Sequence, residues 1–176
     1  MTRPPEPSPE EYAVSPAIGP VPAIYVHMSY EHATTQPQPV PIGGTMSDIP
    51  ADLRYSTDHL WVRPGAGGLV RVGVTDFAQQ SLGDVVDVSP PRPGDTVTAG
   101  QACGDIESVK SLSDLIAPVT GTARARNEDL AEAPDLVNSD PYGHGWLFEI
   151  QSDPAILGQQ LAALMDADAY RELAGA

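Results

Sequence analysis

From Met46 onward, the apolar runs of this chain are short, rich in valine, and separated by glycine and proline. They recur at intervals of about 8–12 residues, a spacing typical of small β-barrels and sandwiches. Residues 69–75 (LVRVGVT) alternate strictly, so the three valines share one face and Leu69, Arg71 and Gly73 share the other. Similar runs predict strands at 84–89, 102–108, 112–119, 121–127 and 145–151. The pattern therefore predicts a mainly β fold, a small barrel or sandwich.

Short helices are predicted between and after these strands. At 75–83, Thr75 is positioned to cap the N-terminus of a helix and Gly83 to end it. Asp153 precedes Pro154, a pair that favours a helix start, and Asp166 is positioned to cap a further helix. Five apolar residues between these two caps fall on one helical face, and we expect them to pack on the core: Ile156, Leu157, Leu161, Leu164 and Met165.

Residues 1–45 differ from the rest in composition. They hold ten of the nineteen prolines, a density that discourages both helix and sheet. We therefore predict a disordered extension at 1–45, and Met46, just after a Gly-Gly break, is a plausible translation start. The folded domain is then 46–176, with a core at about 69–151.

The charge and the cysteine content exclude several functions. The formal net charge of −15 argues against nucleic-acid binding, which needs clustered lysine and arginine, and favours basic patches on protein partners. No apolar run approaches the ~20 residues that span a bilayer, so no membrane partner is expected. Cys103 is the single cysteine, which rules out an intramolecular disulfide and a cysteine metal cluster and indicates a reducing, cytoplasmic setting.

Lys110 is the only lysine in the chain. The sequence around it (IESVKSLSDL) is nearly symmetric about Lys110–Ser111, with Glu107 matched to Asp114. This symmetry predicts two antiparallel strands joined by a tight turn, because residues opposite each other share a face.

The register of this hairpin is open. A turn centred on Val109–Lys110, with Ser108 opposite Ser111, is as compatible as one centred on Lys110–Ser111. Neither turn contains the glycine or asparagine that two-residue hairpins prefer. Both place Lys110 at or next to an exposed tip.

A lysine on a rigid tip suits a carrier protein, because a modifying enzyme can join its amine to an activated carboxylate and so attach a long arm. The alternative is an unmodified surface lysine in a chain that otherwise uses arginine. The hairpin alone does not distinguish the two.

The stretch GDIESVKS at 104–111 resembles the lipoylation motif of the glycine cleavage system H protein family. Four further blocks resemble the same family in order: LRYSTDHLWV (53–62), VRVGVTDFAQQSLGDVV (70–86), KSLSDLIAPVTG (110–121) and LVNSDPYGHGWLFEI (136–150). Biotin carriers usually have methionine on both sides of the lysine, where this chain has Val109 and Ser111. Lipoyl domains of 2-oxoacid dehydrogenases usually have Asp-Lys-Ala and lack the Asn-Ser-Asp-Pro-Tyr block.

The resemblance implies a lipoyl/biotinyl-type hybrid barrel-sandwich with short helices, including C-terminal helices. It implies a non-catalytic carrier with lipoate attached covalently to Lys110. Such a carrier takes the aminomethyl group of glycine from a pyridoxal-phosphate decarboxylase (P protein) to an aminomethyltransferase (T protein). A dihydrolipoyl dehydrogenase (L protein) reoxidises the arm, and a lipoate ligase or a lipoyl/octanoyl transferase attaches it.

Glu107, Ser108, Asp114 and His59 are the residues expected to support the lipoyl-lysine. An acid at the position of Asp114 is part of the family motif and could face the cationic amine of the loaded arm. For Glu107 and Asp114, a role as solvated strand carboxylates is an equally good interpretation.

One position departs from the family pattern. Where the family has His-Glu-Trp, this chain has Leu60 between His59 and Trp61. The family glutamate is thought to help hold the loaded arm, so we expect Leu60 at a half-exposed position beside the arm. Either Asp58 or Asp114 alone supplies the charge, or the loaded arm is held less firmly in this chain.

A second function of a different kind is a lipoyl donor relay, or scaffold, for other lipoyl-dependent enzymes. Transfer of the lipoyl group to a 2-oxoacid dehydrogenase carrier would distinguish it from the glycine cleavage role.

We expect deletion of residues 1–45 to leave the melting temperature and the lipoylation of Lys110 nearly unchanged. Proline-rich segments with few apolar residues bury too little surface to offset the entropy of ordering. Thermal unfolding of the two chains measures this, and a fall of more than a few degrees on truncation would show that the segment packs on the domain.

Overall fold

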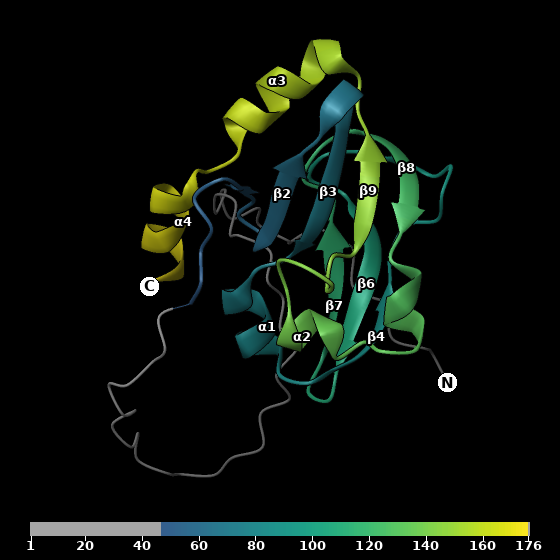
Figure 1. Ribbon diagram of the computed structural model, residues 1–176, viewed down its shortest axis with the longest axis vertical. Coiled ribbons are helices and arrows are strands. Elements are labelled where there is room, and N and C mark those ends of the chain that lie inside the picture. The colour runs from purple at the N-terminus through teal and green to yellow at the C-terminus, as the bar shows by residue number, and fades with distance from the viewer. Residues whose placement is uncertain (1–46, 176) are drawn as a thin grey trace, which may run out of the picture.

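The computed structural model describes residues 47–175 (Figure 1). The predictions for the extension at 1–45 and for a start at Met46 lie outside the described residues.

Residues 47–175 form two antiparallel sheets. The larger has the order β1 (Arg54–Tyr55), β2 (Leu60–Pro64), β3 (Leu69–Val74), β9 (Phe148–Gln151), β8 (Gly121–Arg126) and β5 (Thr96–Val97). The smaller has the order β4 (Val85–Ser89), β6 (Ala102–Ser108) and β7 (Leu112–Ile116). The mainly β prediction is confirmed, although the last strand begins at Phe148 rather than at 145 and the strand after Lys110 ends at Ile116.

Four short α-helices accompany the sheets: α1 (Asp76–Leu82), α2 (Leu136–Ser139), α3 (Pro154–Ala163) and α4 (Ala167–Ala174). Single 3-10 turns occur at Ala66–Gly68 and Glu128–Ala131. Thr75, Asp153 and Asp166 each cap a helix N-terminus through the side chain, as the sequence predicts. The sequence did not predict α2. No helix within 47–175 has the length and apolar character needed to cross a bilayer.

The main core lies between the two sheets. The three valines of β3 are buried, and so are Ile106 of β6 and Leu115 of β7. Residues from both sheets thus belong to one apolar cluster, as expected where two sheets pack face to face. The strict alternation of β3 is what points its valines into this core.

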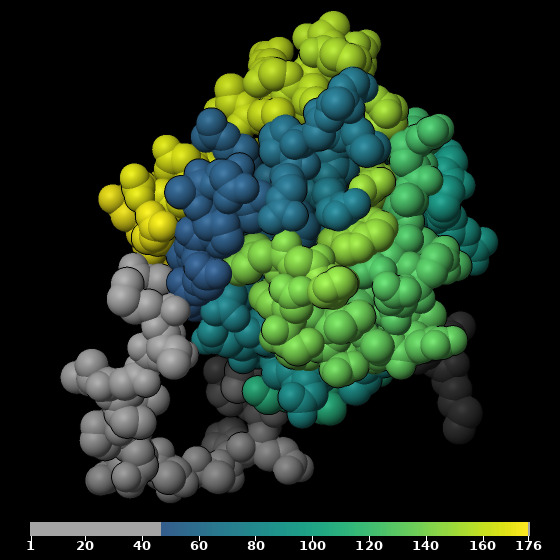
Figure 2. Space-filling view, viewed as in Figure 1, coloured from purple at the N-terminus to yellow at the C-terminus, as the bar shows by residue number. Residues whose placement is uncertain are grey.

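A second apolar cluster covers the outer face of the larger sheet. It contains Ile49 and Leu53 from the chain before β1, Trp61 of β2, and Tyr170 of α4. In the space-filling view, α4 (yellow) lies against the blue segment that includes β1 (Figure 2). Residues 60–62 of β2 and the end of β3 at Gly73 are therefore buried on both faces, whereas Arg71 on the outer face of β3 is half-exposed.

The apolar stripe predicted for the C-terminal helix is only partly correct. Helix α3 ends at Ala163, Leu164 is its C-cap, and Met165 pairs with Tyr55 of β1 in an isolated bridge. Leu157 is buried, whereas Ile156 is 43% exposed. The helix stops because the chain must turn at Leu164 to bring α4 onto the outer face of the sheet.

Gly73 of β3 lies opposite Trp61, and a Cβ placed on Gly73 would be 2.5 Å from Cζ2 of the indole. We expect Gly73→Ala to lower the free energy of unfolding by about 1–3 kcal/mol, because the closely packed indole must move. Gly158→Ala is the matched control, since Gly158 lies in α3 with open space around it. That change should stabilise the protein by about 0.5–1 kcal/mol. Denaturant unfolding measures both, and equal effects of the two changes would contradict the packing argument.

Candidate functional site

Lys110 lies at the tip of the β6–β7 hairpin, at the end of the molecule where α1 and α2 lie (Figure 1). Glu107 pairs with Leu112, and the backbone N–H of Ser108 donates to the carbonyl of Ser111 at 2.8 Å. The turn is therefore centred on Val109–Lys110. The alternative register, centred on Lys110–Ser111, is wrong.

The side chain of Ser108 organises the turn. Its Oγ accepts the backbone N–H groups of Lys110 and Ser111, both at 3.2 Å, and donates to the carbonyl of Ser111 at 3.3 Å. Neither Val109 nor Lys110 has a positive φ. The hydroxyl thus satisfies backbone groups locally, so the turn forms without glycine or asparagine.

The tip is also held from outside the hairpin. The N–H of Val109 donates to the carbonyl of Asp84 at 3.0 Å. The Lys110 side chain runs over Gly83, the C-cap of α1; a Cβ on Gly83 would be 3.1 Å from Cε of Lys110 and 3.2 Å from Nζ. Gly83 has a φ of 78°, which glycine adopts without strain. The lysine is therefore exposed but emerges from a supported position.

Asn138 of α2 fixes the segment under the lysine. Its Oδ1 accepts the N–H of Val85, and its Nδ2 donates to the carbonyl of Gly83, both at 2.9 Å. Nδ2 also donates to Oε1 of Gln79 in α1 at 3.0 Å. One amide thus joins α1, its C-cap and β4.

Exposed apolar side chains surround the base of the lysine. Val109 and Leu112 are each 64% exposed, and Val86 of β4 is 46% exposed. Large apolar side chains exposed to this degree are often contact residues when they lie together.

The outer face of the smaller sheet is acidic. Asp87 of β4 pairs with Glu107 of β6, and Asp105 of β6 pairs with Asp114 of β7. The predicted direct opposition of Glu107 and Asp114 is therefore wrong, because the register is displaced from the symmetric one. Both residues still lie on one face with the lysine at its end.

His59 lies at the other end of α1 from Lys110. Its Nδ1 is 2.8 Å from the hydroxyl of Tyr170, and its ring centroid is 5.0 Å from that of Phe77 in the first turn of α1. Burial lowers the pKa of His59, an effect that the carboxylate of Asp58 opposes. His59 is thus not brought next to the amine of Lys110, and its role as a supporting residue stays a prediction.

Leu60 is only 2% exposed and belongs to the main core. The expectation of a half-exposed position beside the arm is therefore wrong for this residue, because its strand is buried on both faces. A carboxylate placed there would lose its hydration, so the family glutamate has no direct equivalent here. The neighbouring Asp58 is half-buried, and burial raises its pKa.

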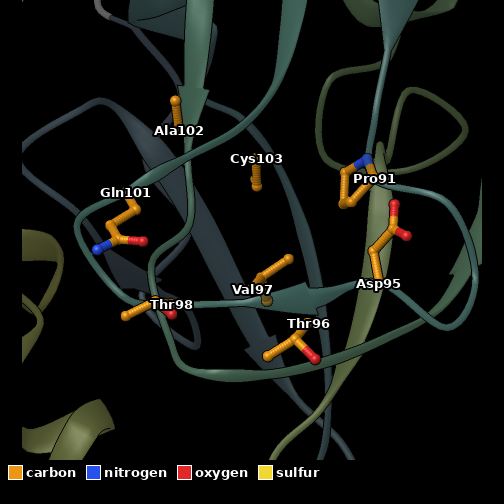
Figure 3. A pocket seen from close by; sticks show the side chains of 8 residues that line it. All are labelled: Pro91, Asp95, Thr96, Val97, Thr98, Gln101, Ala102 and Cys103. Carbon is orange, nitrogen blue, oxygen red and sulfur yellow. The ribbon is translucent and has the colours of Figure 1, made fainter.

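A cleft lies away from the lysine. It has a volume of about 260 Å³ and is lined by residues 91, 95–98 and 101–103 (Figure 3). Cys103 is at its edge, at the opposite end of β6 from the lysine, about 20 Å away at the usual rise per residue. The thiol donates to the carbonyl of Leu115 at 3.3 Å, and burial raises its pKa to about 11. Cys103 lies in the strand predicted at 102–108, is half-buried, and is no reactive thiolate.

Within 47–175, no group of three or more histidine, cysteine or carboxylate side chains is arranged to hold a metal ion. The arrangement at the tip offers one chemical function, an exposed primary amine on a supported turn. The fold and this site together define a small β carrier domain of the lipoyl/biotinyl type.

Comparison with known proteins specifies the family. The sequence profile described as "Glycine cleavage H-protein" matches residues 53–175, so the chain belongs to the glycine cleavage H-protein family. It is 58% identical over 127 residues to the glycine cleavage system H protein of Mycobacterium avium, covering 72% of this chain and 96% of that protein. It is 54% identical over 129 residues to the corresponding protein of Mycobacterium tuberculosis, with the same coverage in both.

The fold has a solved counterpart. The crystal structure of a glycine cleavage system H protein from Mycobacterium marinum matches with a TM-score of 0.65 and 41% identity. The match covers 73% of this chain and all of that one. These findings confirm the predicted family, the barrel-sandwich fold and the class of a lipoyl carrier that is not itself a catalyst.

Several residues of the site have little or no signal in the sequence. Gly83 is recognisable only as a helix end, and nothing in the sequence distinguishes Asp84 or Tyr170. Their contacts with the tip or with His59 run through backbone carbonyls or join distant segments, and such contacts leave no local pattern. The NSDPY block was a signal for Asn138, but its partners were not readable from it.

Ser108→Ala should loosen the tip. We expect it to lower the free energy of unfolding by about 1–2 kcal/mol, because a 5% exposed residue loses several hydrogen bonds to the turn. Amide exchange at Lys110 and Ser111 should rise with it. Ser111→Ala is the matched control: it keeps the backbone carbonyl that Ser108 uses and should change stability by less than about 0.5 kcal/mol. Equal losses in the two variants would show that the Ser108 hydroxyl does not organise the turn.

Proposed function

We propose that Lys110 carries a covalent lipoyl group and that the chain is the aminomethyl carrier of a glycine cleavage system. The observation that carries this proposal is the geometry of the tip: the only lysine of the chain is exposed on a turn held by Ser108 and by the carbonyl of Asp84. Family membership supports the choice of lipoate over other arms.

The residues at the tip fit a lipoyl-lysine. The absence of a side chain at Gly83 leaves room along Cε and Nζ of the lysine, so the modified side chain can lie against α1 without a clash. When attached, the lipoyl group supplies the disulfide that takes up the aminomethyl group of glycine and delivers it to the folate-dependent enzyme. The steps that make and break covalent bonds would be carried out by this group and by the partner enzymes.

The protein contributes position and access. Ser108, Asp84 and Asn138 hold the root of the arm, so that the arm and not the hairpin moves. Glu107 and Asp114 give the adjacent face a negative charge that attracts basic partner surfaces. His59, which packs against Phe77 at the end of α1 away from Lys110, and its neighbour Asp58 are the residues that would hold the distal part of the arm.

The partners of this proposal are the glycine decarboxylase (P protein), the aminomethyltransferase (T protein), the dihydrolipoyl dehydrogenase (L protein), and a lipoate ligase or lipoyl/octanoyl transferase. The exposed Val86, Val109 and Leu112 would contact them around the lysine. We place the reaction in the cytoplasm, in keeping with the bacterial relatives.

Lys110→Arg should abolish lipoylation and glycine–bicarbonate exchange while leaving the fold intact. Arginine keeps the positive charge but stays protonated and cannot form the amide. Intact mass after incubation with a lipoate ligase, followed by the exchange assay, measures both effects. Exchange at the wild-type rate in this variant would overturn the proposal.

A matched control tests whether the tip itself is required. Arg126→Lys combined with Lys110→Arg moves the only lysine to an exposed site on β8. This protein should remain unmodified, because its lysine is not on the hairpin turn. Modification at position 126 would show that the attaching enzyme accepts any exposed lysine.

A further inference from the structure

Tyr170 of α4 is fully buried, yet its hydroxyl makes two hydrogen bonds. The hydroxyl is 2.7 Å from Oγ1 of Thr75 and 2.8 Å from Nδ1 of His59. Its ring stacks on Tyr55 with centroids 4.6 Å apart. A phenylalanine would give the same stacking, so the hydroxyl has a separate role.

The hydrogen bonds form one consistent chain. Oγ1 of Thr75 accepts the N–H of Ala78 and can donate to the Tyr170 hydroxyl, which donates in turn to Nδ1 of neutral His59. A neutral His59 agrees with the lowering of its pKa by burial. The chain begins inside α1 and ends on a residue that packs against Phe77 of α1.

Helix α1 depends on such contacts. It has seven residues, none of them fully buried, and it packs on the main core only through the partly buried Ala78 and Leu82, so its length and packing hold it weakly. Polar contacts at its ends add to this packing. At the N-terminus of α1, Thr75 caps the helix and the hydroxyl of Tyr142 accepts the N–H of Asp76. At the C-terminus, the amide of Asn138 donates to the carbonyl of Gly83.

The end of α1 supports the carrier lysine. Lys110 runs over Gly83, and the N–H of Val109 binds the carbonyl of Asp84 directly after it. A shift of α1 along or around its axis would therefore move the support of the hairpin tip.

We propose that Tyr170 is a positioning residue, whose hydroxyl fixes α1 through Thr75 and His59 and thereby fixes the orientation of Lys110. The C-terminal helix, which lies at the far end of α1 from the lysine, thus sets how the arm is presented to partner enzymes. The inference rests on the proposed function only where it refers to the arm.

The first test is amide hydrogen exchange on the unmodified full chain. Tyr170→Phe should speed exchange at Gln79, Gly83 and Val109 about fivefold to tenfold, the effect of losing one buried hydrogen bond. Tyr55→Phe is the matched control: it removes the hydroxyl of the other stacked tyrosine, which binds the carbonyl of Pro50 and does not touch α1. Tyr55→Phe should leave these three amides unchanged.

The second test uses lipoylated protein in the glycine–bicarbonate exchange reaction. Tyr170→Phe should raise the KM of the decarboxylase for the carrier about threefold to fivefold with kcat unchanged, because a smaller fraction of molecules presents the arm correctly. Tyr55→Phe should change neither constant. Thr75→Ser, which keeps the oxygen, should behave like the wild type in both tests.

Equal rates of amide hydrogen exchange at Gln79, Gly83 and Val109 in the two phenylalanine variants would overturn the inference. An unchanged KM for Tyr170→Phe would overturn it too. If Lys110 proves not to be lipoylated, the proposed function fails, but the exchange test on the unmodified protein still decides whether Tyr170 holds α1.

Discussion

The arrangement around Lys110 depends on the burial of strand β2 on both faces, where it pairs with β3. The inner face of this strand pair packs on the smaller sheet, and on the outer face Trp61 of β2 lies over Gly73 and joins Tyr55 and Tyr170 in the second cluster. Because of this burial, segments from both ends of the described chain, the residues before β1 and helix α4, pack on the same sheet. The burial also explains why Gly73 must be glycine, since the indole of Trp61 lies directly on its Cα.

On this frame, the tip of the β6–β7 hairpin is made firm by polar contacts rather than by packing. Ser108 satisfies the turn from within, and Asp84 and Asn138 hold it from the side. Such contacts suit an exposed position, because an apolar anchor of similar strength would have to be buried and would hide the lysine. Each hydrogen bond contributes only about 0.5–1.5 kcal/mol, so several are needed together.

The negative charges of the smaller sheet lower the stability of the domain itself. Asp87 faces Glu107, and Asp105 faces Asp114, and such like-charge pairs weaken a sheet. None of the four is in an ion pair among the described residues, whose pairs involve Arg71, Arg126 and Arg171. The face is therefore better suited to contact with a basic partner than to stability in isolation, which agrees with the proposed role as a carrier.

Local chemistry in the sequence determined much of this protein. Alternation set the inner face of β3, Thr75, Asp153 and Asp166 set three helix starts, and the motif around Lys110 indicated the family. The local sequence did not determine the register of the β6–β7 hairpin. The two candidate registers differ by two residues in pairing, so both keep Ile106 and Leu115 on the inner face and both oppose two acids. The observed register carries both the local hydrogen bonds of Ser108 and the bond from Val109 to Asp84, which is distant from the turn in sequence. Three further features were decided only by the tertiary structure: the burial of Leu60, the end of α3 at Ala163, and the contact of Tyr170 with Thr75. Each depends on which distant segment packs against the residue and not on its neighbours in the chain.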